Sequence, residues 1–366
     1  MPETLLPTSE FVEAIIRRRL AQQQLTGPRA TSVAEVVRHS LAVQAQDPPL
    51  SRWSLGLRAG VADDETVRAA VSSGEVLRTH VLRPTWHYVH RGDIRWLLEL
   101  TSPKVLSGSR GRHRQLGITD EVQAQAFSVF TDLLSRGPMT RKELQPHLPG
   151  TGFPQQGQVV AHLLMVAELC GLICSGPLTD KGEHSYTLLD SVVPAAAPLR
   201  REEATDRLVR RFVTGHGPTS IKDLQRWCTI TKREALAVFA APDFTHEVVD
   251  EVDLWSLPST ELPADGLGGV LLLPTFDEAF LSHDRPHFPR LPGHRLGEQH
   301  LSAAEAGRGF VIVDGVDVGC FRRMKSSRKA GPSVQVQLHL ADGVDPEGQR
   351  LAEQVQRMVD FFDARG

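Results

Sequence analysis

The chain has 366 residues, of which 40% are hydrophobic and 23% are charged, and its formal net charge at pH 7 is −3. This length exceeds what one hydrophobic core usually supports, so two or three modules are expected. The small negative charge excludes nucleic-acid binding through the overall charge of the protein, which leaves a local basic surface as the way to bind DNA.

The first predicted module, residues 1–115, consists of helices followed by a β-hairpin. Apolar side chains recur at helical spacing in three segments, and the next segment alternates as strands do. Asp93 then stands where it would cap a further helix. The three helices are expected at residues 11–25, 31–46 and 63–74, and the hairpin at residues 75–90.

The second predicted module, residues 116–195, shows the same order more clearly. Residues 120–136 have an apolar stripe at helical spacing, and Gly137-Pro138 ends that helix. Thr140 and Glu143 have the spacing of a capping box, which opens a short second helix. A third, very apolar helix is expected at residues 158–171, and a hairpin turning at residues 180–182.

Residues 196–366 contain a third copy of this order and then a different region. Helices are expected at residues 203–218, 219–230 and 232–240, followed by a strand-rich return. The region beyond about residue 265 has strand-like segments and a closing amphipathic helix. A polar Pro/His/Arg-rich loop, residues 282–295, lies between these strands and is either a functional element or a surface connection.

Three helices followed by a hairpin is the plan of a winged helix, and its recurrence in one order is more informative than a single copy. The sequence therefore predicts an α+β protein of three tandem winged-helix domains with a small C-terminal sheet and helix. In the second module the presumed groove-reading helix is so apolar that we expect it to be packed inside the protein, as scaffold rather than reader.

Cysteine usage and the N-terminus indicate a cytoplasmic protein. The four cysteines form no CxxC pair, so buried thiols are expected rather than a metal site. The N-terminus has no secretion signal, and no apolar run is long enough to span a bilayer. Only seven of the 41 basic residues are lysines, which fits either phosphate binding by arginine or a GC-rich genome.

The triplet Gln44-Ala45-Gln46 stands at the end of the second expected helix, just before Asp47 and Pro48. Residues i and i+2 lie about 200° apart on a helix, but on the same side of an extended segment. A residue before proline is pushed out of the helical region, so the helix should stop near Gln46. This would allow the two amides to converge, although surface amides remain the alternative.

Two glutamines suit only an undemanding reaction, because an amide is uncharged and is a poor base. They can orient a water molecule, and their oxygens can stabilise a developing cation. Guanine alkylated at N7 is already a good leaving group because its ring carries a positive charge. Its hydrolysis from deoxyribose needs little more than positioning and electrostatic stabilisation.

Four segments, LAVQAQDPPLSRWSLGLR, LRTHVLRPTWHYVHRGDIRWLL, LLLPTFDEAFLSHDR and FVIVDGVDVGCFRR, resemble in order the winged-helix DNA glycosylases typified by AlkZ and YcaQ. The resemblance runs over essentially the whole chain. It implies tandem winged-helix domains around a concave DNA-binding face. The family signature is Gln-Φ-Gln in the AlkZ-like branch and Gln-Φ-Asp in the YcaQ-like branch, where Φ is apolar, so Gln44 and Gln46 indicate the AlkZ-like branch.

The resemblance implies a base-excision repair enzyme that removes N7-alkylated guanine, including bulky or crosslinked adducts of DNA-alkylating natural products. Such enzymes often serve antibiotic self-resistance. It implies hydrolysis by Gln44 and Gln46 without metal or other cofactor, on double-stranded DNA, by a monomer associated with the nucleoid when bound. The first lysine of the chain is Lys104, so no lysine near Gln44 is available for a Schiff base.

Other residues are candidates for contacts with DNA or the lesion. Strand alternation would place Arg83, Thr85 and His87 on one face, with Trp86 on the other as a core residue. Affinity based on phosphate contacts would fall with salt. The further candidates are His283 and Arg285 in the C-terminal loop, Arg322 and Arg323 after a strand, and the basic cluster Arg110, Arg112 and Arg114.

Two alternatives remain at this point. A non-catalytic winged-helix transcriptional regulator would bind intact promoter DNA through base-edge contacts from a recognition helix. An enzyme of the YcaQ-like branch would accept a broader range of substrates, although Gln46 in place of Asp weighs against it.

Overall fold

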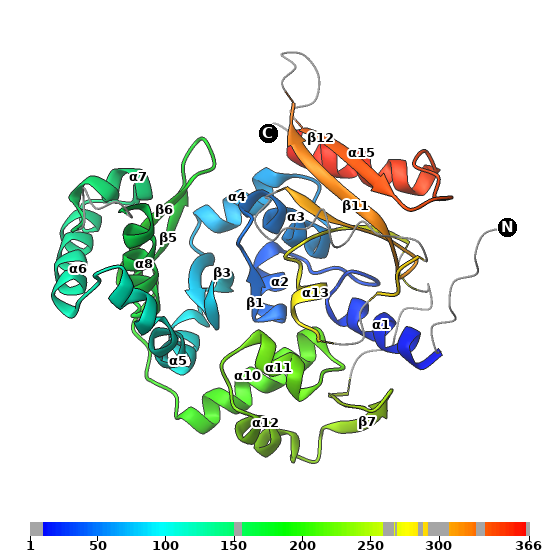
Figure 1. Cartoon of the computed structure of the whole chain (residues 1–366), viewed down its shortest axis with the longest axis horizontal. Coiled ribbons are helices and arrows are strands. Elements are labelled where there is room, and N and C mark those ends of the chain that lie inside the picture. Colours follow the sequence, from blue (N-terminus) through cyan, green and yellow to red (C-terminus); the bar gives the residue numbers. More distant parts are fainter. Residues whose placement is uncertain are drawn as a thin grey trace.

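The structure is a computed structural model, and it describes residues 10–149, 156–258, 267, 269–284, 288–291, 307–326 and 334–363. Helices and short antiparallel sheets follow one another in these ranges as three similar units and a C-terminal sheet (Figure 1). The mixed α and β composition and the three helix-then-hairpin units agree with the predicted fold class. No helix in these ranges is both long and apolar enough to cross a bilayer.

The first unit has more elements than the sequence predicted. Its sheet has the strand order β1-β3-β2 and is antiparallel. The elements in chain order are α1 (Glu10–Gln22), α2 (Val33–Ser40), β1 (Ala42–Gln44), α3 (Pro48–Ala59), α4 (Asp64–Ser72), β2 (Val76–Val81), β3 (Arg83–His90) and α5 (Ile94–Gln115).

The helix expected at residues 31–46 ends earlier, at Ser40. Leu41 has a φ of 65°, which breaks the helical path, and its side chain is fully buried. The following residues instead form β1, which satisfies its backbone hydrogen bonds along β3. The expectation that the helix continues to Gln46 was therefore wrong, because burial of Leu41 and pairing with β3 outweigh helix propensity.

Asp47 and Pro48 begin a helix rather than end one. The Asp47 side chain accepts a hydrogen bond from the Leu50 N–H at 3.4 Å, and proline occupies the first turn of α3. Proline has no N–H to lose at this position, so it suits a helix start. Asp47 and Pro48 were interpreted from sequence only as the end of a helix, and α3 was not expected.

The second unit follows the prediction closely. The capping box of Thr140 and Glu143 is present, with the Thr140 N–H donating to the Glu143 carboxylate at 2.7 Å. Its sheet has the order β4-β6-β5. The elements are α6 (Asp120–Leu134), β4 (Met139–Thr140), α7 (Arg141–Leu144), a 3₁₀ turn (Gln145–His147), α8 (Gln156–Leu169), β5 (Ile173–Leu178), β6 (His184–Leu188) and α9 (Leu189–Val192).

Helix α8 is an internal scaffold, as its apolar sequence predicted. Val160, Leu163 and Leu164 are buried, and the helix contacts α6 on one side and β2 and α5 of the first unit on the other. A helix covered in this way has no free face for a DNA groove.

The third unit repeats the plan with two further capping boxes, at Ser220 with Asp223 and at Thr231 with Glu234. Its core merges with that of β2, β3 and α5, since Phe212 and Trp227 belong to the same apolar cluster as Leu77. The elements are α10 (Arg201–His216), α11 (Ile221–Trp227), α12 (Lys232–Phe239), β7 (Thr245–Val249) and β8 (Val252–Ser256).

The C-terminal region forms the predicted sheet and closing helix, and also a short helix, α13, that was not predicted. The antiparallel sheet has the order β12-β11-β10-β9. The elements are β9 (Val270–Pro274), α13 (Glu278–Leu281), β10 (Arg308–Val313), β11 (Val316–Lys325), β12 (Val334–Leu340) and α15 (Gln349–Asp363).

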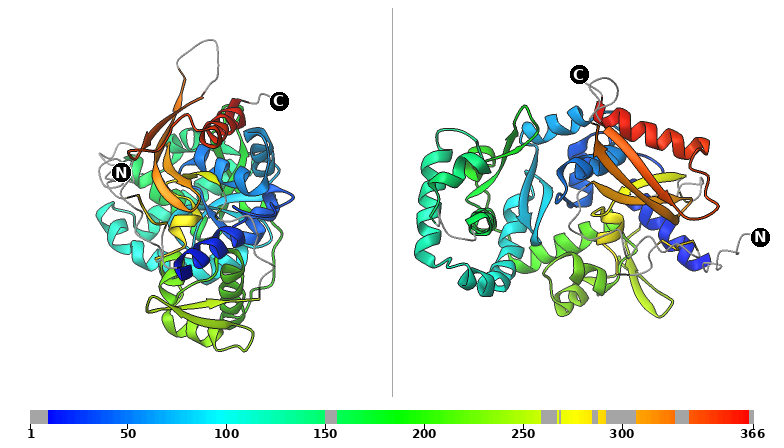
Figure 2. Two further views of the ribbon diagram at one scale, coloured as in Figure 1. Left: turned by 90° about the vertical axis from the view of Figure 1, so that its right-hand side faces the viewer. Right: turned by 45° about the horizontal axis from the view of Figure 1, so that its top comes forward.

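This sheet packs on the first unit, although it follows the third unit in sequence (Figures 1 and 2). The Trp53 indole of α3 donates to the Leu272 carbonyl at 2.8 Å, and its ring meets Phe361 of α15 at 5.2 Å. A side chain at Gly56 would meet Phe361 at 2.5 Å, so glycine permits this approach. The domain limits 1–115, 116–195 and 196–366 stay a prediction, while the packing joins the first unit to the C-terminal sheet.

Candidate active site

The two glutamines of the triplet lie against consecutive residues of β3. Gln44 is 5% exposed and its Oε1 accepts from the Thr85 hydroxyl at 3.4 Å. Gln46 is exposed, and its Oε1 accepts from the Trp86 N–H at 3.4 Å. Neither Ala45 nor Gln46 is helical, and each of the two amides has a contact with β3.

The backbone of the triplet is held more tightly than its side chains. The Gln44 N–H donates to Glu278 Oε1 at 2.7 Å, and the Ala45 N–H donates to the Trp86 carbonyl at 2.8 Å. The Ala45 carbonyl accepts from Arg78 Nε at 3.1 Å, and the Ala45 side chain is completely buried. Buried backbone groups with partners fix the positions from which the two amides extend.

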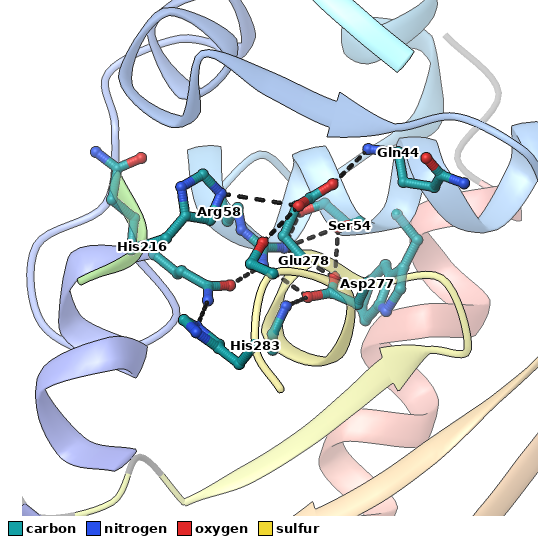
Figure 3. Close-up of polar contacts among 12 residues, drawn as sticks. Gln44, Ser54, Arg58, His216, Asp277, Glu278 and His283 are labelled. Atoms are coloured by element: carbon teal, nitrogen blue, oxygen red, sulfur yellow. Dashed lines mark hydrogen bonds and ion pairs between the residues drawn. The ribbon is translucent and has the colours of Figure 1, made fainter. Parts of the chain in front are cut away.

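Behind the triplet lies a buried layer of charged residues from α3 and α13 (Figure 3). Asp277 binds Arg58 through two contacts of 2.7 and 2.9 Å and accepts from the Ser54 hydroxyl at 2.5 Å. Burial alone would raise the pKa of Asp277, but the attraction of Arg58 outweighs it and holds the pKa below its ordinary value. Asp277 is therefore a carboxylate that is matched by one cation.

Glu278, the next residue, is also fully buried but has neutral donors as its partners. It accepts from Gln44, from the Trp227 indole N–H at 2.9 Å and from the Ser282 hydroxyl at 2.7 Å. Neither Asp277 nor Glu278 was a candidate in the sequence analysis. The available signal was two adjacent acids directly after a buried apolar strand, inside one of the segments that carried the resemblance.

The β3 candidates share a face with Gln44, as alternation predicted. His87 pairs with Gln44 in the sheet register and is fully buried. Its Nδ1 hydrogen-bonds to the Thr85 carbonyl at 3.0 Å, so Nδ1 carries the proton of the neutral ring. Burial, and then the charge of Arg83, lower the pKa of His87 well below its ordinary value. In this conformation His87 supports the site from within and has no surface to offer DNA.

Arg83 is half-buried, and its Nε and Nη2 atoms are buried without a hydrogen-bond partner. Burial lowers its pKa. Trp86, on the opposite face, is half-buried under the Arg78 guanidinium at 4.2 Å and beside the His80 ring at 4.4 Å. In this conformation the two partnerless donors of Arg83 are covered by protein, so Arg83 would have to turn outward to reach DNA.

The other candidates come from elements other than β3. His283 is buried, with its Nε2 3.2 Å from the amide of Gln23, and so belongs to the buried layer. Arg322 is exposed on β11, while the Arg323 guanidinium stacks on Phe362 at 3.9 Å. Arg285 lies outside the described residues.

The basic cluster Arg110, Arg112 and Arg114 occupies the last turns of α5. Arg110 and Arg114 are exposed, whereas Arg112 donates to Gln115 at 2.9 Å and to Gln158. The structure thus brings Gln44, Gln46 and the three β3 residues together, and leaves this cluster on a separate element.

Comparisons with known proteins define the class to which this fold and site belong. The family model described as DNA glycosylase AlkZ-like matches residues 37–361. A curated relative, the interstrand DNA cross-link repair glycosylase of Streptomyces sahachiroi, is 24% identical and is matched over 81% of this chain and 84% of its own. The solved structure of the DNA glycosylase AlkZ of that organism superposes with a TM-score of 0.71, at 19% identity over 98% of both chains.

The chain belongs to the AlkZ-like DNA glycosylase family. Its members are hydrolases that act on N-glycosyl bonds, so DNA is the partner, and the regulator considered above is excluded as the class of this protein. The resemblance found in the sequence, with its assignment to the AlkZ-like branch, is confirmed.

Proposed function

We propose that the protein excises N7-alkylated guanine from double-stranded DNA by hydrolysis, with Gln44 and Gln46 as catalytic residues. The observation that carries the proposal is the placement of two neutral amides beside one strand, with a buried carboxylate hydrogen-bonded to the backbone of the first. This arrangement offers hydrogen bonds and negative electrostatic potential but no strong base, which suits a leaving group that is already cationic.

In this proposal the amide oxygens face the anomeric carbon of the damaged nucleotide. As the bond to the cationic base breaks, positive charge develops on the sugar, and the oxygens of Gln44 and Gln46 stabilise it. One amide also orients the attacking water, which gives an abasic site and the free base.

The physiological substrates are proposed to be bulky or crosslinked adducts of DNA-alkylating natural products, in a self-resistance role. The name of the Streptomyces sahachiroi relative, which refers to interstrand cross-link repair, supports this extension. Monomeric action, and DNA contacts through Arg83, Thr85, Arg322 and the α5 cluster, complete the proposal. Of these, Arg83 is half-buried, and its side chain would have to turn outward to bring Nε and Nη2 to a phosphate.

The test is base release from duplexes that carry single N7-alkylguanine adducts, from methyl to crosslinked, measured by mass spectrometry under single-turnover conditions. Gln44→Ala and Gln46→Ala should each slow release at least tenfold, which corresponds to about 1.4 kcal/mol of barrier. Ser135→Ala, at the exposed end of α6, serves as the unchanged control. Normal release by the Gln44/Gln46 double variant would refute the assignment.

A further inference from the structure

Glu278 differs from the buried carboxylates of Asp277 and Asp223 in the partners of its two oxygens. Its Oε1 accepts from the Gln44 N–H (Figure 3). Its Oε2 accepts from the Trp227 indole and the Ser282 hydroxyl. An indole and a backbone N–H can only donate, so both oxygens act as acceptors, which is the role of an ionised carboxylate.

None of these three donors is a cation. His216 Nε2 lies 3.8 Å from Oε2, but burial, and then the charge of His283, lower the pKa of His216 well below its ordinary value. That ring is therefore neutral. Arg83 interacts with Glu278 only through space, without a hydrogen bond in the described residues. Asp277, by contrast, has the bidentate contact to Arg58, and Asp223 has a contact of 3.2 Å to Arg19.

We propose that Glu278 is a positioning residue for the reaction, which holds the backbone of Gln44 and places a negative charge behind it. The inference rests on the proposed function, in which positive charge develops on the sugar facing the amides. A charge that no adjacent cation neutralises acts over a longer range in a buried environment than in water. The neutral amides then form the contact surface, and Glu278 supplies the anionic field that they lack.

The test separates this role from a purely structural one through a matched pair of variants. Glu278→Gln keeps the size of the side chain and removes its charge. Glu168→Gln makes the same change at a carboxylate that is equally buried but contacts His80 rather than the triplet. Both variants should lose stability, so excision is measured at a temperature at which thermal unfolding curves show both to be folded.

The expected result is a single-turnover rate at least tenfold below wild type for Glu278→Gln, with an unchanged or lower Kd for adduct-bearing DNA. Glu168→Gln should excise at close to the wild-type rate. A structural defect would raise Kd along with the fall in rate. Equal rates for wild type and Glu278→Gln would overturn the inference and leave the proposed function intact.

A second measurement does not depend on activity. Hydrogen exchange of the Gln44 amide, followed by NMR, should be slow in the wild type and faster in Glu278→Asp, whose shorter side chain keeps the charge but withdraws from Gln44. If the wild type releases no adduct, the proposed function fails, and this exchange alone decides whether Glu278 holds the triplet. Unchanged exchange in Glu278→Asp would overturn the positioning role.

Discussion

The glutamine side chains and the buried layer behind them are held in contrasting ways. The amide oxygens of Gln44 and Gln46 have contacts of 3.4 Å to neutral donors, and Gln46 is open to solvent. In the buried layer, Arg58 and Asp277 are joined by charged hydrogen bonds of 2.7 and 2.9 Å without any exposure. The site therefore combines a support held by short charged hydrogen bonds with glutamine side chains held by longer contacts to neutral donors.

The largest expected effect concerns the buried layer. Asp277→Ala leaves Arg58 as a buried cation without its partner, which should lower the free energy of unfolding by about 3–5 kcal/mol. The exposed pair of Asp314 and Arg350 is the control, since Arg350→Ala should cost at most about 1 kcal/mol. Urea unfolding of both variants measures the contrast. A similar small loss for both would mean that the buried layer is not the rigid support.

The second-largest expected effect is a loss of folding stability at acidic pH. Burial is the main reason why the pKa values of His87 and His216 lie well below the ordinary value near 6.5. As the pH falls, the unfolded chain therefore binds more protons than the folded one. Stability conferred by the neutral rings is complete above about pH 6.5 and is lost as the pH falls towards the lowered values. Each ring contributes a slope of up to about 1.4 kcal/mol per pH unit.

Urea unfolding at pH 7, 6 and 5 measures this slope. In His216→Phe, which keeps a ring against Phe212, the slope should be smaller. Stability that rises on acidification from pH 7 to 5 would contradict the assignment of both rings as neutral.

A smaller effect is expected where the two regions meet. Asp47 caps α3 directly after Gln46, and its other oxygen accepts from the Gly307 N–H at 2.6 Å. Asp47→Ala should cost about 1 kcal/mol, as loss of a helix cap does, and should also slow excision because the end of the triplet loosens.

Asp63→Ala removes the cap of α4, which accepts from the Thr66 N–H at 2.7 Å, away from the triplet. It should cost a similar amount of stability without slowing excision. Thermal unfolding and single-turnover rates are compared for both. Equal excision rates for the two variants would mean that the cap of α3 does not contribute to the reaction.

The smallest expected effect concerns DNA affinity. If Arg83 turns outward and binds one phosphate, Arg83→Gln should reduce the slope of log K against log salt by about 0.9. Arg350→Gln, at an exposed ion pair on α15, should leave that slope unchanged. Fluorescence anisotropy at several salt concentrations measures the slope for both variants. An unaltered slope in Arg83→Gln would mean that Arg83 does not contact a phosphate.

Local signals explain why much of the fold was predictable. The capping box of Thr140 and Glu143 and the turns of the hairpins depend on neighbouring residues, which sequence shows directly. The end of α2 was not predictable in this way, because Leu41 leaves the helix to bury its side chain and to let β1 pair with β3, some 40 residues on. Pairing of distant segments has no local signature.

The candidate site also has features that local sequence predicts and features that depend on contacts between distant segments. The glutamine triplet, its position just before Asp47 and Pro48, and the face shared by Arg83, Thr85 and His87 could be predicted from sequence. The burial of His87 could not, and neither could the contact of Glu278 with Gln44 across 234 positions. The physical reason is that a buried polar group needs a partner wherever the chain supplies one, and that partner comes from packing of the C-terminal region on the first unit.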